Sequence, residues 1–257
     1  MTLDPRWIVP DWPAPRRVKA FVTTRAGGVS QGEYASLNLG RHSGDDPERV
    51  ARNRAIVREL LPAEPMWLAQ VHGADVAPAR HFRIEAERTG EYRMPEAPRA
   101  DACVADAPGQ VCVVLTADCM PVFFCDAAGT RVAVAHAGWR GLAAGVLENT
   151  LAAMGVAPAH VMAWMGPAIG PDAFEVGTEV RDAFLARDAG AHTAFRAGKP
   201  GKYMADLYAL ARQRLAAAGV GSVRGGGFCT YHEAERFFSY RRVQQSGRMG
   251  AFIWMER

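Results

Sequence analysis

Three residues of this sequence carry side chains that bind transition metals. His72 stands in Gln-Val-His-Gly, Cys119 ends Leu-Thr-Ala-Asp-Cys, and His136 begins His-Ala-Gly-Trp-Arg-Gly. Two imidazoles and one thiolate suit zinc in a site that keeps a fourth position for water or substrate, whereas a closed structural site needs a fourth protein ligand. We therefore expect the chemistry of this protein where these three segments meet.

The spacing of Cys119 and His136 predicts that both lie on one face of a β-hairpin. The segment 126–131 is a turn between two apolar runs, and a loop of two or four residues gives the same register, in which paired residue numbers sum to 257. Cys119 then lies opposite Gly138 and becomes a diagonal neighbour of His136, with Cα atoms roughly 7–8 Å apart. Bonds of about 2.0–2.3 Å let one metal ion bridge them. His72 lies outside this hairpin, and the spacing does not show how it comes close to the other two residues.

Taken singly, a cysteine is more often a small buried hydrophobic residue, and a histidine more often a polar surface or core residue, than a ligand. The three residues differ from this background because each ends a strand-like segment beside glycine or polar residues. Cys103, Cys112 and Cys125 lie in apolar or loop contexts that fit the ordinary structural role.

Composition narrows the class of protein. The chain has 257 residues, 49% apolar and 22% charged, which is typical of a globular enzyme. A net charge of +3 without a Lys/Arg run argues against nucleic acid as a partner. No apolar run long enough for a membrane span and no signal-peptide pattern are seen. Five cysteines without a CxxC pair indicate a reducing compartment. We expect a cytoplasmic protein, monomeric by default.

The pattern of elements favours an α+β fold, because the predicted strands outnumber the helices and come in runs. A polar, Pro-containing stretch over 86–100 predicts a surface loop rather than a domain boundary. The predicted strands are 18–25, 66–72, 111–117, 121–126, 131–136, 160–165, 227–229 and 250–255, and the predicted helices are 47–61, 141–154, 177–187 and 204–218.

The ordered motifs of the chain resemble those of the YfiH family, also called the laccase-domain or polyphenol oxidase family. Its members are described as purine nucleoside phosphorylases or peptidoglycan editing factors. The motifs cover nearly the whole chain: Thr-Thr-Arg-Ala-Gly-Gly-Val-Ser (23–30), Ser-Leu-Asn-Leu-Gly (36–40), Gln-Val-His-Gly (70–73), Ala-Asp-Ala (100–102), Thr-Ala-Asp-Cys-Met-Pro-Val (116–122), His-Ala-Gly-Trp-Arg-Gly (136–141), Gly-Pro-Ala-Ile-Gly (166–170), Cys-Thr-Tyr (229–231) and Phe-Phe-Ser-Tyr-Arg-Arg (237–242).

The resemblance implies one domain over residues 1–257. Its fold would be a β-sandwich of two α-β units with flanking helices, like the catalytic domain of cytotoxic necrotizing factor. It also implies that His72, Cys119 and His136 are the family's metal-binding and catalytic residues. The activities credited to the family are phosphorolysis of adenosine, inosine and methylthioadenosine, deamination of adenosine, and oxidation of phenols.

Each activity needs further residues. Deamination needs a metal-activated water and an acid or base, a role open to Asp75 or Asp118, although orienting a ligand histidine is the role we favour for them. Phosphorolysis needs an anion site. Arg140 lies where a predicted helix begins, and Arg25 and Arg41 lie in glycine-containing loops.

Aromatic residues near these motifs are candidates for stacking on a purine, although large aromatic side chains are more often core. These are Trp139, Phe237 and Tyr240.

Other functions are compatible with the same residues. A multicopper cluster needs many histidines in close pairs, and this chain has seven separated ones, but one thiolate and two imidazoles can bind a single copper. A copper-dependent polyphenol oxidase is therefore one alternative. A Cys-His hydrolase that edits peptidoglycan precursors, with Cys119 as nucleophile and His136 as base, is another. A non-enzymatic binding role is a further one. We expect a zinc-dependent purine nucleoside phosphorylase with adenosine deaminase activity, acting on a nucleoside and phosphate.

Overall fold

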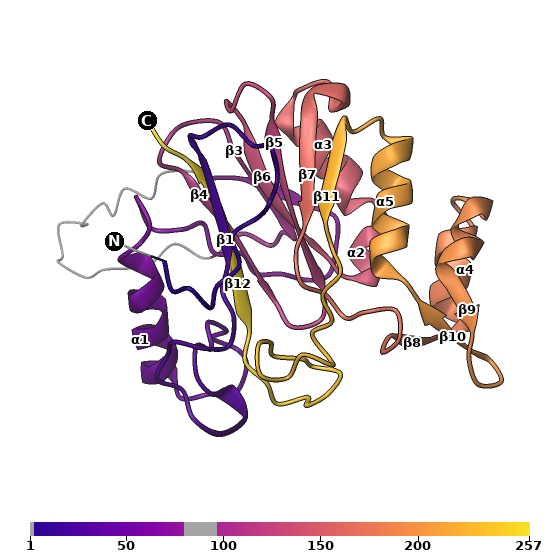
Figure 1. Cartoon of the computed structure of the whole chain (residues 1–257), viewed down its shortest axis with the longest axis horizontal. Coiled ribbons are helices and arrows are strands. Elements are labelled where there is room, and N and C mark those ends of the chain that lie inside the picture. The colour runs from indigo at the N-terminus through magenta and orange to yellow at the C-terminus, as the bar shows by residue number, and fades with distance from the viewer. Residues whose placement is uncertain (1–2, 80–96) are drawn as a thin grey trace.

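The computed structural model describes residues 3–79 and 97–257, so most of the predicted loop over 86–100 lies outside the described residues. Three sheets organise these residues (Figure 1). A six-stranded sheet has the order β11-β7-β5-β6-β3-β2, a three-stranded sheet the order β1-β12-β4, and a small sheet the order β8-β10-β9. The fold is α+β, as predicted.

The bounds of the elements follow the apolar segments of the sequence. The strands are β1 (Val18–Val22), β2 (Val76–Pro78), β3 (Ala102–Ala105), β4 (Val111–Thr116), β5 (Met120–Asp126), β6 (Val132–Ala137), β7 (Val161–Met165), β8 (Glu175–Gly177), β9 (Phe195–Ala197), β10 (Lys202–Ala205), β11 (Ser222–Gly225) and β12 (Met249–Met255). The α-helices are α1 (Pro47–Arg58), α2 (Trp139–Ala144), α3 (Val146–Met154), α4 (Thr178–Leu185) and α5 (Leu207–Ala217), and short 3-10 helices span Gly32–Tyr34, Pro158–His160 and Ala189–Ala194.

Alternation along β5 and β6 explains how the sheets and helices pack. Phe123 and Val134 face the three-stranded sheet and pack with residues of β1, β4 and β12. Phe124 and Ala135 face the opposite way and pack with the residues of α3 and α5. Both strands are wholly buried, as expected for the central strands of a sheet covered on both faces. In Figure 1, α1 accordingly lies beside β1 and β12, and α2, α3 and α5 lie on the other side.

The hairpin of β5 and β6 has the predicted register. Pro121 pairs with His136 and Met120 with Ala137, so the residue numbers sum to 257. The loop has four residues, because the main chain of Asp126 bonds to Arg131 and the Asp126 carboxylate accepts the N–H of Thr130 at 2.6 Å. The predicted placement of Cys119 and His136 on one face is confirmed.

Three predicted elements differ from the structure. Residues 66–72 form isolated bridges rather than a strand, because the Gln70 side chain, not its main chain, bonds to the N–H and C=O of Leu115. The predicted helix 141–154 is broken at Gly145, where φ is 102°. No strand occupies 227–229, since three successive glycines, 225–227, have φ of 78–88°.

No helix in the described part of the chain is long and apolar enough to cross a membrane.

Candidate metal centre

The three predicted ligand residues lie together. One imidazole nitrogen each of His72 and His136 and the Cys119 Sγ are all within 4.8 Å of one another, and the two imidazole rings have centroids 4.9 Å apart. A tetrahedral zinc with bonds of about 2.0–2.3 Å holds its ligand atoms roughly 3.5 Å apart. The donor set therefore fits one ion after small side-chain rotations.

Each of these residues comes from a different kind of segment. His136 belongs to β6 and is buried, Cys119 ends the turn between β4 and β5 and is half-buried, and His72 lies in an irregular segment before β2 and is exposed. The cluster is thus anchored in the sheet on one side and open to water or a small molecule on the His72 side.

Backbone strain concentrates at this cluster. Among the described residues, the non-glycine positions with left-handed φ are His72, at 59°, and Asp118, at 90°. Such conformations are costly for residues with a Cβ and persist where surrounding contacts hold them. Both positions therefore need an identifiable anchor.

Electrostatic coupling makes Cys119 and His136 a charged pair. Burial alone would raise the pKa of the Cys119 thiol, but the charge and hydrogen bonds of His136 and His72 outweigh it and lower the pKa to about 6. Burial would lower the pKa of His136, but the Cys119 thiolate and Asp101 raise it to about 9. A thiolate, the form that binds metals and acts as a nucleophile, is therefore favoured at neutral pH.

The carboxylate that contacts one of the candidate ligand histidines is that of Asp101, which the sequence analysis did not single out. Its Oδ1 lies 2.8 Å from the Nδ1 of His136. The side chain of Asp75 is exposed, and its main-chain oxygen accepts the N–H of Asp101 at 3.0 Å. In the sequence, Asp101 is visible only as the middle residue of the family motif Ala-Asp-Ala (100–102).

Asp118 anchors loops instead. Its carboxylate accepts the hydroxyl of Thr230 at 2.6 Å and the N–H of Arg241 at 2.7 Å. These bonds hold the β4–β5 turn, with its left-handed Asp118, against the loop that follows β11. Asp118 therefore supports the position of Cys119 through the backbone.

Two glycines allow the segments to approach. A Cβ on Gly138 would lie 2.6 Å from the Cys119 Sγ, and a Cβ on Gly141 would lie 2.7 Å from the main-chain oxygen of Gly73. The start of α2 thus packs directly beneath the thiol and against the loop that carries His72, which explains both glycines of His-Ala-Gly-Trp-Arg-Gly.

The three predicted anion-binding arginines have different surroundings. Arg25 donates from Nε to the Ala35 oxygen at 2.7 Å and from Nη1 to the Ala234 oxygen at 2.9 Å, so its guanidinium joins two loops. Arg140 is exposed, with its guanidinium 4.6 Å from the ring centre of Trp139. Arg41 is exposed.

A further arginine, Arg248, is close enough to Cys119 and Asp118 to feel their charges. Its main-chain N–H bonds to Asn38 at 2.9 Å, and its Nη1 donates to the Ser246 oxygen at 2.6 Å. Burial lowers the pKa of Arg248, while the negative charges of Cys119 and Asp118 act in the opposite direction, so the guanidinium lies within electrostatic range of both. The next residue, Met249, pairs with Thr116 at the end of β4. No local sequence pattern marked Arg248.

The three aromatic residues predicted to stack on a purine differ in how far they are buried. Phe237 is fully buried in a cluster with Phe238 and Met249, so it belongs to the core. Trp139 is half-buried and packs against the core cluster that Phe124 and Ala135 form with α3 and α5. Tyr240 is 51% exposed, and its ring centre lies 5.8 Å from the Arg248 guanidinium carbon. Tyr240 is therefore the one of the three with a ring free to meet a base.

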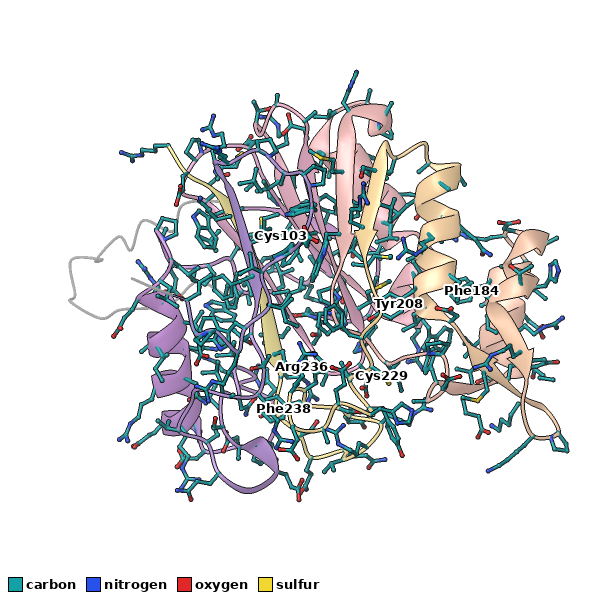
Figure 2. The ribbon with its side chains drawn as sticks, viewed as in Figure 1. Cys103, Phe184, Tyr208, Cys229, Arg236 and Phe238 are labelled. Atoms are coloured by element: carbon teal, nitrogen blue, oxygen red, sulfur yellow. The ribbon has the colours of Figure 1, made fainter. Side chains whose placement is uncertain are left out.

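The Gly-Pro-Ala-Ile-Gly motif (166–170) connects three other segments of the chain through its main-chain N–H groups. The Tyr208 hydroxyl accepts the Ala168 N–H at 2.9 Å, and the Cys229 Sγ accepts the Gly170 N–H at 3.3 Å (Figure 2). The Ile169 N–H bonds to the main-chain oxygen of Asp118 at 2.9 Å. Through this last bond, the segment 166–170 helps to fix the turn between β4 and β5 that carries Cys119.

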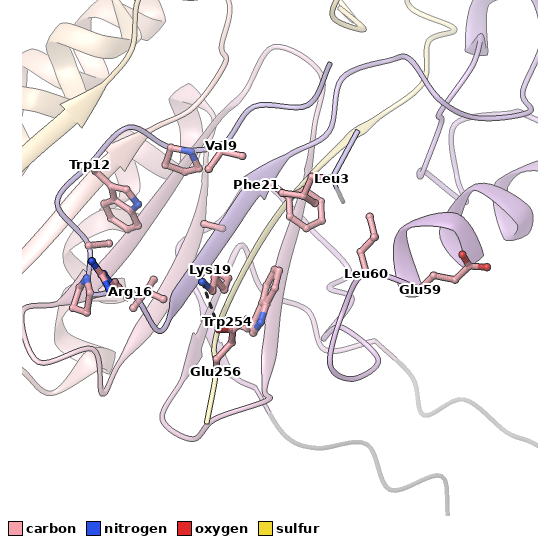
Figure 3. A pocket seen from close by; sticks show the side chains of 15 residues that line it. Leu3, Val9, Trp12, Arg16, Lys19, Phe21, Glu59, Leu60, Trp254 and Glu256 are labelled. Carbon is pink, nitrogen blue, oxygen red and sulfur yellow. Dashed lines mark ion pairs between the residues drawn. The ribbon is translucent and has the colours of Figure 1, made fainter. Parts of the chain in front are cut away.

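A cavity lies in another part of the structure. It has a volume of about 630 Å³ and is lined by the N-terminal segment, β1 and the end of β12, including Trp12 and Trp254 (Figure 3). Lys19 and Glu256 form an ion pair of 3.4 Å along it. None of the three candidate ligand residues lines it.

The structure combines an α+β fold with one cysteine and two histidines that are close enough to hold a metal ion, and these features define the class of protein. The chain belongs to the family described as multi-copper polyphenol oxidoreductase laccase, whose sequence model matches residues 19–256. The predicted resemblance is confirmed.

Curated relatives and solved structures agree with this family. The chain is 53% identical to a purine nucleoside phosphorylase of Pseudomonas aeruginosa over 97% of this chain and 98% of the relative, and 55% identical to purine nucleoside phosphorylase YfiH of Escherichia coli over 96% and 98%. The crystal structure of the Neisseria meningitidis protein NMB0706 is 52% identical, with a TM-score of 0.90 over 98% of this chain and 100% of that one.

Proposed function

We propose that this protein is a zinc-dependent purine nucleoside phosphorylase that converts adenosine, inosine or methylthioadenosine and phosphate to the free base and the corresponding ribose 1-phosphate, and that it also deaminates adenosine. The observation that carries the proposal is the gathering of His72, Cys119 and His136 within 4.8 Å, with His72 exposed to incoming molecules. The names of the curated relatives support a nucleoside phosphorylase.

His72, Cys119 and His136 would hold the metal. A bound zinc would supply a Lewis acid and an activated water at the open position. The residues themselves set the geometry: β6 fixes His136, and the turn held by Asp118 presents Cys119. In phosphorolysis the bond between the sugar C1′ and the base nitrogen breaks, a bond from C1′ to a phosphate oxygen forms, and the departing base takes up a proton.

Phosphate needs a cation near the cluster. Arg140 and Arg41 are exposed and available, whereas the Arg25 guanidinium already serves two carbonyls. Arg248 also donates to two carbonyls, those of Ser246 and Gly247, through Nη1. It joins these candidates because, unlike Arg25, it is acted on by the charges of Cys119 and Asp118. The neighbouring Tyr240 ring would meet the base.

We expect Arg248→Gln to raise the KM for phosphate about tenfold, since a charge-assisted contact is worth about 1.5 kcal/mol. The zinc content should stay unchanged. The measurement is the rate of inosine phosphorolysis against phosphate concentration. The matched control is Arg52→Gln, which changes an exposed arginine on α1 and should leave the KM unchanged. An unaltered KM in Arg248→Gln would remove Arg248 from the anion site.

A hydrolase is the second candidate, because a specific contact favours it. Cys119, His136 and Asp101 stand in the order of a nucleophile, a base and an orienting carboxylate, with 2.8 Å between Asp101 and His136. In cleavage of an amide or ester of a peptidoglycan precursor, the Cys119 sulfur would attack the carbonyl carbon and the amine or alcohol would leave with a proton from His136. Water would then hydrolyse the thioester and release the acid and the free thiolate.

One experiment on the purified protein distinguishes the phosphorylase from the hydrolase. Metal analysis is combined with release of hypoxanthine from inosine, with and without phosphate, and of ammonia from adenosine. We expect one zinc per chain and hypoxanthine release that requires phosphate. Stoichiometric copper with turnover of phenols would instead support the oxidase. A metal-free protein that releases no hypoxanthine would contradict the phosphorylase and leave the hydrolase.

A further inference from the structure

One buried carboxylate joins two of the candidate ligand residues. Asp101 is fully buried and receives four hydrogen bonds, from the main-chain N–H groups of Val71 at 3.1 Å, His72 at 2.9 Å and Gly73 at 2.7 Å, and from the ring of His136 at 2.8 Å. A buried carboxylate is costly unless it is fully paired, and four donors satisfy it. Burial raises the pKa of Asp101, but these bonds and the His136 charge outweigh burial and lower it.

On the His136 side, the contact selects a ring nitrogen. An ionised carboxylate only accepts hydrogen bonds, so Nδ1 of His136 must carry the proton. The other ring nitrogen, Nε2, is then the one left to bind a metal once its proton is lost, or to exchange a proton with the Cys119 thiol. The main-chain N–H of His136 also bonds to the Asp101 main-chain oxygen at 2.7 Å, so side chain and backbone are fixed by the same residue.

On the His72 side, the contact holds a strained turn. Three successive N–H groups, of Val71, His72 and Gly73, converge on one carboxylate, and the middle residue has φ of 59°. Such a concave set of N–H groups binds an anion. The anion therefore stabilises the left-handed His72 and fixes where its imidazole projects.

We propose that Asp101 is a positioning residue that sets both imidazoles of the centre through one carboxylate, so that its loss disturbs two ligands at once. The proposal rests on the ligand set named under the proposed function. Asp75 is exposed and the Asp118 carboxylate accepts from Thr230 and Arg241, whereas the Asp101 carboxylate bonds directly to the His136 ring.

The test is the zinc affinity of Asp101→Asn, measured by competition with a chromophoric chelator, together with the ring ¹H–¹⁵N signals of His136. The asparagine side chain has one oxygen, so it can accept from only part of the four donors. Its NH₂ group would face the remaining N–H donors and cannot bond to them. We expect zinc affinity to fall about 10- to 100-fold. We also expect the downfield Nδ1–H signal of His136, present in the wild type with or without zinc, to be lost or shifted.

Asp126→Asn is the matched control. Asp126 is also a buried aspartate that accepts main-chain N–H bonds at a turn, those of Thr130 and Arg131, but at the opposite end of the same hairpin. It should lower the stability of the fold without changing zinc affinity or the His136 signal.

Two results would overturn the role of Asp101. One is zinc binding by Asp101→Asn within twofold of the wild type with an unchanged His136 signal. The other needs no variant: a wild-type His136 whose proton resides on Nε2 and not on Nδ1. A wild type that binds no zinc, by contrast, contradicts the proposed function, while the His136 signal still decides the role of Asp101.

Discussion

Replacing Cys119 with alanine is expected to abolish stoichiometric zinc binding and to slow inosine phosphorolysis about a thousandfold or more. The thiolate is the only anionic member of the set formed with His72 and His136, and two imidazoles alone bind zinc more weakly than three protein ligands. The contribution of a Lewis acid is several kcal/mol, and about 4 kcal/mol corresponds to a thousandfold in rate. Metal analysis and the phosphate-dependent release of hypoxanthine measure both effects on one sample.

The control for this variant is a second half-buried cysteine. Cys229→Ser retains an acceptor for the Gly170 N–H, which the Cys229 Sγ binds at 3.3 Å, and lies outside the three-ligand set. It should keep its zinc and its activity. Full phosphorolysis by metal-free Cys119→Ala would refute the zinc-dependent function, whereas loss of activity in both variants would indicate a general effect on folding.

The hairpin that carries Cys119 and His136 could be predicted because its register depends on a local turn. Asp126 caps that turn with its own side chain, and both plausible loop lengths give one register. Side chains then alternate with a period of two, so placing one residue places the others. Sequence reasoning succeeds where the geometry follows from a few adjacent residues.

The arrival of His72 could not be predicted, because it depends on contacts between distant segments. Its turn is held by Asp101, 29 residues further along the chain, through main-chain N–H groups that no side-chain pattern reveals. The same reason hid Asp101 itself: a buried aspartate and an exposed one look alike in a sequence. Arg248 was missed because its relation to Cys119 exists only after β12 pairs with β4.

Glycines explain most of the errors in the predicted elements. A helix over 141–154 was expected to continue through Gly145, but the chain turns there with φ of 102° and begins a second helix. Tertiary packing decides whether an interior glycine is tolerated or used as a joint. The sequence alone also does not show why Gly138 is a glycine. The reason is the close approach of the Cys119 side chain and not the backbone conformation of Gly138.

Gly138→Ala is expected to impair the centre although alanine suits the local backbone. Gly138 has φ of −70° and ψ of 163°, which any residue adopts, but the new Cβ would lie 2.6 Å from the Cys119 Sγ. Either the thiol or the start of α2 must move. We expect a loss of about 1–3 kcal/mol in the free energy of unfolding, typical of overpacking, and zinc affinity lower by about tenfold or more, since ligand geometry is disturbed.

A double-mutant cycle separates this clash from any other effect of the alanine. In the Cys119→Ala background the Sγ is absent, and the remaining contacts of the new Cβ, with the Cys119 Cβ and the His72 Cδ2, are ordinary at 3.5 Å. Gly138→Ala should therefore cost little there, which gives a coupling of about 1 kcal/mol or more. Denaturant unfolding in the presence of a chelator measures all four proteins without a contribution from bound metal. An equal cost in both backgrounds would show that the thiol does not rest on Gly138, and the packing account of the His-Ala-Gly-Trp-Arg-Gly motif would then be wrong.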